Sequence, residues 1–229
     1  MNSWFEKLYD TFIVDNNYKL LLEGFGNTIL ITLSALLIGV VIGSIIAIAK
    51  YYAEGNKKLQ FISWICDIYT TVIRGIPVTV LLMIFYFIII ISDTEGITTA
   101  IIAFGINSGA YVAEIIRGGI MSIDKGQTEA GRSLGLSKAQ TMIYIVIPQA
   151  IKNVLPPIGN EFIVLLKETA IVGYVSLTDL TRAANQITSR TYEAFMPLIG
   201  AAVIYFTIIK ILTVLLEKLE RRLRKSDNR

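Results

Sequence analysis

Apolar runs separated by short polar segments dominate the chain, and their lengths predict helices that cross a membrane. A helix needs about 20 mostly apolar residues to span the hydrocarbon layer of a bilayer. The runs that meet this requirement cover approximately residues 26–49, 61–91, 97–116, a segment that ends near 167, and 195–216. The pattern predicts an all-α membrane protein with about five transmembrane helices.

Two of these runs carry internal signals. In the first, Ala35, Gly39, Gly43 and Ala47 recur every four residues. This spacing places small side chains on one helix face, where another helix can approach closely. The alternative is a lipid-facing helix that is rich in glycine for no packing reason. The second run breaks at Pro77, because proline lacks a backbone donor and pushes the preceding residue away from helical geometry.

The ends of the chain differ from its middle. Residues 1–22 mix aromatic and charged side chains, which predicts an amphipathic segment at the membrane surface. Residues 23–217 hold the membrane-spanning runs, and residues 218–229 form a basic tail. We therefore expect three parts: an N-terminal surface segment, a transmembrane domain and a tail.

Lysine and arginine in the polar connections predict the orientation of the chain, because cytoplasmic loops are enriched in both. Segments 50–60 and 117–140 and the tail are basic or mixed in charge, whereas residues 1–22 and 92–96 lean acidic. The N-terminus is therefore expected outside the cell and the C-terminus in the cytoplasm. The loop 168–193 fits least well, since it falls outside although it carries two arginines.

The composition narrows the range of functions. Hydrophobic residues make up 54% of the chain and charged residues 17%, with a mean hydropathy of +0.61, as in integral membrane proteins. With no histidine and one cysteine, the chain lacks the commonest general base and cannot form an internal disulfide or a thiolate metal cluster. No phosphate-binding G-x-x-x-x-G-K-[ST] loop occurs. We expect no catalytic residue, metal, cofactor or nucleic-acid partner, and any ATP must be hydrolysed by another chain.

The polar segment between the third and fourth runs is the most informative part of the sequence. Asp124 is well placed to cap a helix, and Gln127 three residues later completes a capping box. Gly135 suits the left-handed conformation that ends many helices. Ser137 and Gln140 repeat the capping pattern. The segment is thus predicted to be a solvated helix–turn–helix.

The surface of this helix–turn–helix suggests a docking site for another protein. Its first helix, expected to end at Leu134, exposes Lys125, Glu129 and Arg132. Ala130 and Leu134 are placed to pack inward or into a groove of a partner. The alternative is an ordinary cytoplasmic loop with good helix caps.

At these positions the sequence resembles the EAA loop of permease subunits of binding-protein-dependent ABC importers. The resemblance rests on Glu129-Ala130-Gly131, on Gly135 and on Ile147-Pro148-Gln149-Ala150. The third position holds Gly131 rather than alanine, which keeps a small residue but lowers helix propensity by about 1 kcal/mol.

Further motifs resemble the polar amino acid branch of these permeases, which serves histidine, glutamate, glutamine, arginine and opines. They are Arg74-Gly75-Ile76-Pro77, the run 108–119 and the run 155–162. Ile76 stands where this branch often has threonine. The matches occur in the same order as in the family and together cover about residues 20–217.

This resemblance implies the fold, location and partners of the chain. It implies a type I ABC importer permease in the lipid of the bacterial plasma (inner) membrane, multi-pass and without catalysis of its own. The implied partners are an ATPase subunit dimer that binds the ATP and Mg, a second permease subunit (the same chain or a paralogue), and an external solute-binding protein that delivers the amino acid. The residues that it assigns to ATPase coupling are Glu129, Ala130, Gly131 and Gly135.

Ionisable and polar side chains within the apolar runs predict a substrate site. An ionised group at mid-bilayer costs about 2.5–3.5 kcal/mol, so such groups usually face a protein interior or a water-filled cavity. Glu161 and Glu168 are seven residues apart and share one helix face, where two carboxylates would pair with a cationic substrate. Asn160 adds an amide beside them, and Asn107 and Tyr111 supply neutral contacts. Arginine, lysine or histidine is the favoured substrate, with glutamine, glutamate and cystine as alternatives.

The same charged residues also have structural interpretations. Glu168 can reach the outer interface and pair with Lys167, and Glu161 can pair with Arg74 or line a helix interface. Glu114 lies near the inner surface, and we expect it to have a structural role.

Two other classes of function compete with an ATP-driven permease. An ion-coupled secondary transporter would need no ATPase, but such proteins are commonly built from inverted repeats, and none is evident in this chain. A membrane-embedded enzyme would need a histidine, a metal cluster or a nucleophile–base pair. Copurification of an ATPase would separate the permease from both.

Overall fold

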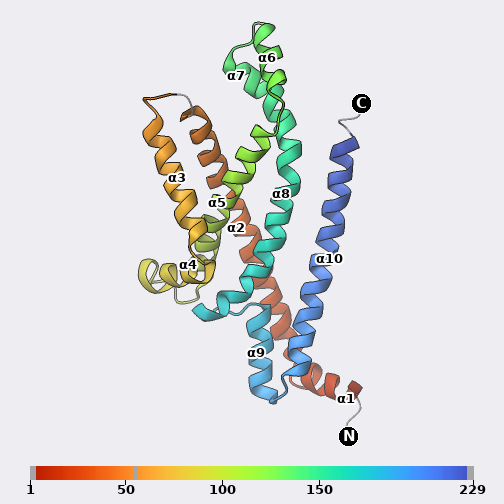
Figure 1. Ribbon diagram of the computed structural model, residues 1–229. Coiled ribbons are helices and arrows are strands. Elements are labelled where there is room, and N and C mark those ends of the chain that lie inside the picture. Colours follow the sequence, from red (N-terminus) through yellow and green to blue (C-terminus); the bar gives the residue numbers. More distant parts are fainter. Residues whose placement is uncertain (1–3, 54–55, 226–229) are drawn as a thin grey trace. The chain divides into compact units, whose positions relative to one another are not determined.

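Helices account for nearly all of the chain that the computed structural model describes, residues 4–53 and 56–225 (Figure 1). No strand occurs within these residues, in agreement with the predicted all-α class. The α-helices, the π-helices η1–η3 and the 3-10 helix η4 are, in chain order, α1 (Trp4–Tyr9), η1 (Asp10–Val14), α2 (Asn17–Ala53), α3 (Gln60–Gly75), α4 (Val78–Ile84), η2 (Phe85–Ile89), α5 (Ile97–Met121), α6 (Lys125–Ser133), α7 (Lys138–Thr141), η3 (Met142–Val146), α8 (Ile147–Glu168), η4 (Thr169–Val175), α9 (Leu180–Thr191) and α10 (Phe195–Lys225).

Three of the described helices, α2, α5 and α10, are long and apolar enough to cross a membrane. The pair formed by α3 and α4–η2 meets the same requirement only as one broken span, with the break at the predicted Pro77. The remaining expected span corresponds to α8, whose 22 residues extend about 33 Å at 1.5 Å per residue. Because α8 is less apolar than α2, α5 and α10, we assign it as a span from its length and from the expected alternation of external and cytoplasmic connections along the chain.

The first span begins earlier than its apolar run suggests. α2 starts at Asn17 rather than near residue 26, and Asn17 Nδ2 donates to Thr11 O at 2.8 Å. Gly24 lies inside this helix, and a Cβ atom there would be 2.5 Å from the backbone oxygen of Asp179. Glycine at this position therefore allows the backbones of α2 and Asp179 to approach closely.

The chain forms two compact units, and α2, α5, α8 and α10 each contribute residues to both. We name the units after a helix that lies wholly within each. The α9 unit comprises Met1–Leu36, Pro77–Gly105 and Phe162–Thr213, and the α6 unit comprises Leu37–Ile76, Ile106–Glu161 and Val214–Arg229. Residues 226–229, including Arg229 of the expected basic tail, lie outside the described residues.

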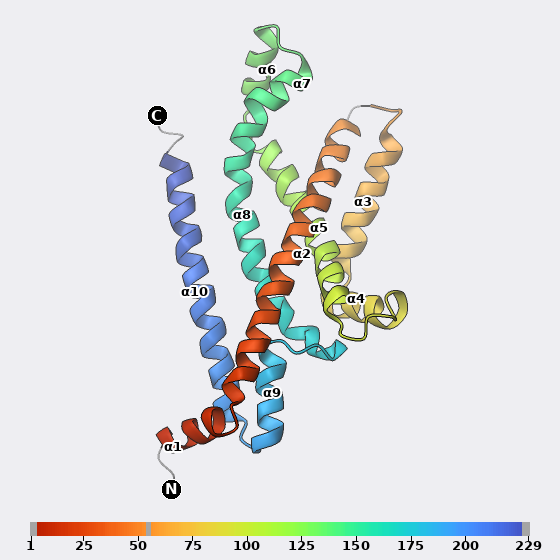
Figure 2. The same ribbon diagram turned by 180° about the vertical axis from the view of Figure 1, so that it is seen from behind.

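Two clusters of buried apolar side chains hold the α9 unit together. One includes Phe104, Leu82 and Leu165 and joins parts of α2, α4, α5, α8 and η4. In the other, α9 buries Leu180 and Ile187 against α2 and α10. Both ribbon views place α9 beside the first part of α10 (Figures 1 and 2). Helix α9 is thus anchored along its apolar side, which leaves its polar side to form a surface.

The α6 unit confirms the close packing expected from the repeated small residues of α2. A Cβ atom at Gly39 would lie 2.7 Å from Ser108 Oγ, and one at Gly43 would lie 2.7 Å from Val112 Cβ. These contacts bring the second half of α2 against α5. The interpretation as a glycine-rich lipid-facing helix is therefore wrong for these two positions.

The acidic turn 92–96 holds the start of α5. Asp93 Oδ2 accepts hydrogen bonds from Thr99 N at 2.6 Å and Thr99 Oγ1 at 2.8 Å, and Oδ1 accepts from Gly96 N at 3.2 Å. Partial burial raises the pKa of Asp93, but these hydrogen bonds outweigh that effect and hold the pKa below its ordinary value. The ionised carboxylate therefore stabilises the turn.

Candidate functional site

Helix α6 begins at the predicted cap. Asp124 Oδ1 accepts a hydrogen bond from Gly126 N at 2.6 Å, which confirms Asp124 as the N-cap. The prediction that Gln127 completes a capping box is wrong, since its Oε1 atom accepts from Gln149 Nε2 at 3.4 Å. A long-range contact has taken the place of the local one.

The turn after α6 follows the sequence prediction closely. Gly135 has φ +84°, in the left-handed region that favours glycine. Ser137 and Gln140 form the full capping box, with Gln140 N donating to Ser137 Oγ at 3.2 Å and Ser137 N donating to Gln140 Oε1 at 2.8 Å. Helix α6 ends at Ser133, one residue earlier than expected, and Leu134 is its C-cap. Both ribbon views place α6 and α7 near the start of α8 (Figures 1 and 2).

The four residues assigned to coupling divide into two groups. Glu129 and Ala130 are exposed, and so is Leu134, which is 80% accessible. Gly131 is buried, and Gly135 shapes the turn. The partner-groove interpretation of Ala130 and Leu134 is therefore the one that their exposure favours.

Gly131 has a packing reason to replace the alanine of the family pattern. A Cβ atom at this position would lie 2.8 Å from Ile145 Cδ1 and 2.8 Å from Thr141 Cγ2. Contacts this short require the neighbouring side chains to move. The glycine therefore lets α6 lie directly on η3.

Gln149 connects α6, η3 and α8, although the sequence did not single it out as a coupling residue. Its Nε2 atom donates to Ile145 O at 2.8 Å and to Gln127 Oε1 at 3.4 Å, so one side chain links α6, η3 and α8. The adjacent Pro148 has no N–H for the preceding turn, and a π-helix, η3, lies immediately before it. We call the five residues Gln127, Gly131, Thr141, Ile145 and Gln149 the coupling joint. In the sequence, Pro148 was the signal that could have indicated this irregular connection.

The predicted substrate residues are dispersed among different environments. Glu161 is buried, with 8% of its surface exposed, and the Ser108 hydroxyl lies beside its carboxyl group. Asn107 is also buried, with 3% exposed. Asn160 is exposed and lines a cavity of about 630 Å³ in the α6 unit. Neither Glu161 nor Asn107 lines that cavity.

Arg74 contacts an aromatic ring and not the predicted carboxylate. Its guanidinium carbon lies 5.1 Å from the ring centre of Tyr111, in a cation–π arrangement. Within the described residues, no lysine or arginine nitrogen lies within 4.0 Å of a Glu161 oxygen. The alternative that Glu161 pairs with Arg74 is therefore wrong, because the ring on α5 occupies the guanidinium.

Glu168 and Glu114 lie in different surroundings. Glu168 is half-buried at the end of α8 and belongs to the α9 unit, whereas Glu161 belongs to the α6 unit, so a site shared by the two remains a prediction. Glu114 Oε2 lies 2.8 Å from Arg117 Nη2, and its Oε1 lies 3.8 Å from Lys50 Nζ. These ion pairs confirm the structural role expected for Glu114.

Comparison with known proteins agrees with this geometry. Residues 39–225 match the family model described as binding-protein-dependent transport system inner membrane component. The arginine transport system permease protein ArtQ of Bacillus subtilis (strain 168) is 40% identical over 90% of this chain and 94% of its own length. The glutamine transport system permease protein GlnP of Escherichia coli (strain K12) is 35% identical over 90% of this chain and 93% of its own.

Solved structures give the same result for the fold. The crystal structure of an amino acid ABC transporter with histidines matches with a TM-score of 0.81 and 43% identity, over 90% of this chain and 94% of the other. The inward-facing MetNI methionine ABC transporter matches with a TM-score of 0.77 at 20% identity, over 90% of this chain and 97% of the other, which shows the fold alone. The chain is therefore a multi-pass inner-membrane protein that belongs to the binding-protein-dependent transport system inner membrane component family, as a permease of the polar amino acid branch of ABC importers.

Proposed function

We propose that this permease carries cationic amino acids, most favourably arginine, lysine or histidine. The observation that carries the proposal is the buried carboxyl group of Glu161, which has no cationic partner among the described residues. A buried carboxylate without a counter-charge is costly. A guanidinium or ammonium group that passes along α8 would supply that charge.

Relatives support this proposal without deciding the substrate. ArtQ is named for arginine transport and GlnP for glutamine transport, and both align along most of this chain. Glu168, Asn160, Asn107 and Tyr111 complete the proposed set of substrate residues. Neutral and acidic amino acids, such as glutamine, glutamate and cystine, are the alternative substrates, and they carry an α-ammonium group but no cationic side chain to pair with a carboxylate.

Transport is driven by a separate ATPase that docks on α6. Exposed Glu129, Ala130 and Leu134 form the proposed contact surface, while Gly131 and Gly135 fix its shape. ATP and Mg bind to a dimer of these ATPase subunits. A second permease subunit, identical or paralogous, completes the path across the membrane, and an external solute-binding protein delivers the substrate.

Replacement of Glu161 by glutamine tests the substrate proposal. Glu161→Gln keeps the volume and removes the charge, so uptake of radiolabelled arginine into proteoliposomes that hold the complete importer should fall at least tenfold. Glu217→Gln, a substitution of an exposed carboxylate near the C-terminus, is the matched control. Unchanged arginine kinetics in an intact Glu161→Gln complex would overturn the proposal, and glutamine uptake that exceeds arginine uptake in the wild type would favour the alternative substrate.

The proposed orientation has its own test. A cysteine placed at exposed Ser133 should react with a membrane-impermeant maleimide only after right-side-out vesicles are opened, because α6 is expected in the cytoplasm. The native Cys66 is buried and gives a low background. Labelling of sealed right-side-out vesicles would place α6 outside and would contradict both the orientation and the docking of an ATPase there.

A further inference from the structure

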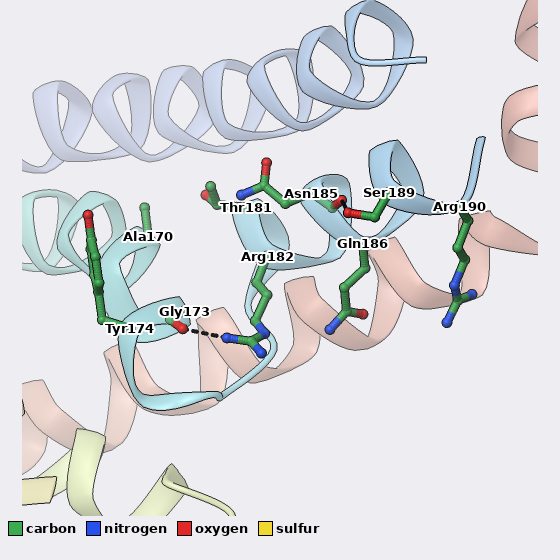
Figure 3. A pocket seen from close by; sticks show the side chains of 9 residues that line it. All are labelled: Ala170, Gly173, Tyr174, Thr181, Arg182, Asn185, Gln186, Ser189 and Arg190. Carbon is green, nitrogen blue, oxygen red and sulfur yellow. Dashed lines mark hydrogen bonds between the residues drawn. The ribbon is translucent and has the colours of Figure 1, made fainter. Parts of the chain in front are cut away.

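Helix α9 and η4 form an open polar cavity that transport through the membrane does not explain. Its volume is about 690 Å³, and it lies wholly in the α9 unit. Figure 3 shows the side chains of Arg182, Gln186 and Arg190 extending from the same side of α9. Tyr174 from η4 and Asn185 of α9 also line the cavity. The lining is rich in hydrogen-bond donors, which favours ligands that carry acceptor oxygens.

The cavity also carries an excess of positive charge. Helix α9 has two arginines and no acidic residue. Arg182 donates to the backbone oxygen of Gly173, and exposed Arg190 has no ion-pair partner among the described residues. The adjacent acids are engaged elsewhere: Asp179 caps α9, and Glu193 Oε1 accepts from Phe195 N at 3.0 Å.

The expected location makes these arginines unusual. In the proposed orientation α9 lies on the external side, and the positive-inside rule disfavours arginine in short external loops. Two arginines in an external loop go against that bias, which favours a role for them at the external surface. The apolar side of α9 is already buried, so the charged side is the part that remains for a partner.

The spacing of the arginines indicates the size of the ligand. Residues 182 and 190 are eight positions apart on a helix, which separates their Cα atoms by about 12 Å. In Figure 3 the Gln186 side chain lies between the two guanidinium groups. A single amino-acid carboxylate is too small to engage both. A protein surface with two or more carboxylates about 12 Å apart has the required dimensions.

We propose that the polar side of α9 docks an acidic surface of the external solute-binding protein, through Arg182 and Arg190. The proposal rests on the proposed function, which supplies the partner and the orientation. Charge complementarity of this kind chiefly raises the association rate and makes binding sensitive to salt. The contact would hold the binding protein on the importer while its substrate is released.

Stimulation of ATP hydrolysis by the binding protein tests the proposal. The complete importer in nanodiscs is titrated with its purified, substrate-loaded solute-binding protein at two salt concentrations. For Arg190→Glu, the half-saturating concentration of the binding protein should rise about tenfold and depend less on salt, with the maximal rate unchanged. Arg190→Lys should have a smaller effect. Lys19→Glu makes the same change of charge at an exposed position on the same expected side, outside the cavity, and should shift the half-saturating concentration less than twofold.

Each alternative outcome has a defined meaning. If the wild type is not stimulated at all, the proposed function fails and the docking proposal fails with it. If the wild type is stimulated and Arg190→Glu has the same half-saturating concentration, docking at α9 alone is overturned. An unchanged half-saturating concentration with a lower maximal rate would assign the cavity to the substrate carboxylate. Separation of the paired permease subunits on size-exclusion chromatography would assign it to a second permease. Both results would overturn the docking proposal.

Discussion

Substitution of Gly131 by alanine is the most direct test of the coupling joint. The new Cβ atom would lie 2.8 Å from both Ile145 Cδ1 and Thr141 Cγ2, so at least one of the two side chains must move. Alanine is nevertheless the residue of the family pattern and a better helix former. The substitution therefore has two opposing effects on stability, a packing cost and a gain in helix propensity, and the measured change shows which is larger.

The two effects can be separated with a matched control. Overpacking of a close contact typically costs about 1–3 kcal/mol, and a glycine-to-alanine change within a helix gains about 1 kcal/mol. Gly118 is also helical, but a Cβ atom there would meet nothing within 4 Å. Gly118→Ala should therefore show the propensity gain alone, and Gly131→Ala should be less stable than Gly118→Ala by the packing cost.

Two quantities are measured. Chemical denaturation gives the unfolding free energy of the permease within its complex, and a separate assay gives the stimulation of ATP hydrolysis. Thr141→Ser removes Cγ2, so it should recover part of the loss when it is combined with Gly131→Ala, as a non-additive double-mutant cycle. Equal stabilisation by Gly131→Ala and Gly118→Ala would refute the close-packing explanation. In that case close packing would not explain why position 131 holds glycine rather than alanine.

Three further predictions concern the turn at Gly135, the coupling joint and the acidic turn 92–96. Gly135→Val places a β-branched residue at φ +84°, and we expect the protein to insert but to lose substrate-stimulated ATP hydrolysis; retained stimulation would contradict this role. Gln149→Leu removes the hydrogen bonds to Ile145 and Gln127 at similar volume, and it should lower stimulation severalfold with unchanged basal hydrolysis, whereas full stimulation would exclude Gln149 from coupling. The folded-state pKa of Asp93 is lowered, so its contribution to stability is present above the unfolded pKa of about 3.9 and is lost as the pH falls through the folded value. Asp93→Asn should therefore lower the melting temperature at pH 7 but much less at pH 3, and an equal shift at both would refute the assignment.

Local signals in the sequence predicted the elements that local physics controls. Gly135 and the box of Ser137 and Gln140 were correct because their hydrogen bonds join residues at most three positions apart. The repeat that contains Gly39 and Gly43 was correct because small residues at helical spacing have few uses besides close packing. Such features need no knowledge of what lies across the fold.

Features set by distant residues were not predictable in the same way. Gln127 was assigned to its own helix cap, but a side chain 22 positions away forms its hydrogen bond. Arg74 was a reasonable partner for a buried carboxylate, yet Tyr111 on another helix contacts it. In each case the local pattern admitted two answers, and a tertiary contact selected one.

In the proposed coupling segment, the surface expected to contact the ATPase is separate from the connection expected to transmit movement. A short helix acts as a lever only if its attachment resists bending. Two features form the attachment of α6. Gly131 lets α6 contact η3 directly, and the Gln149 side chain links η3 to α8 beside Pro148. Glu129 and Leu134, which take no part in this attachment, are exposed. Substitutions on the exposed side should therefore change the affinity for the ATPase, whereas substitutions in the coupling joint should leave that affinity intact and reduce transport per ATP hydrolysed.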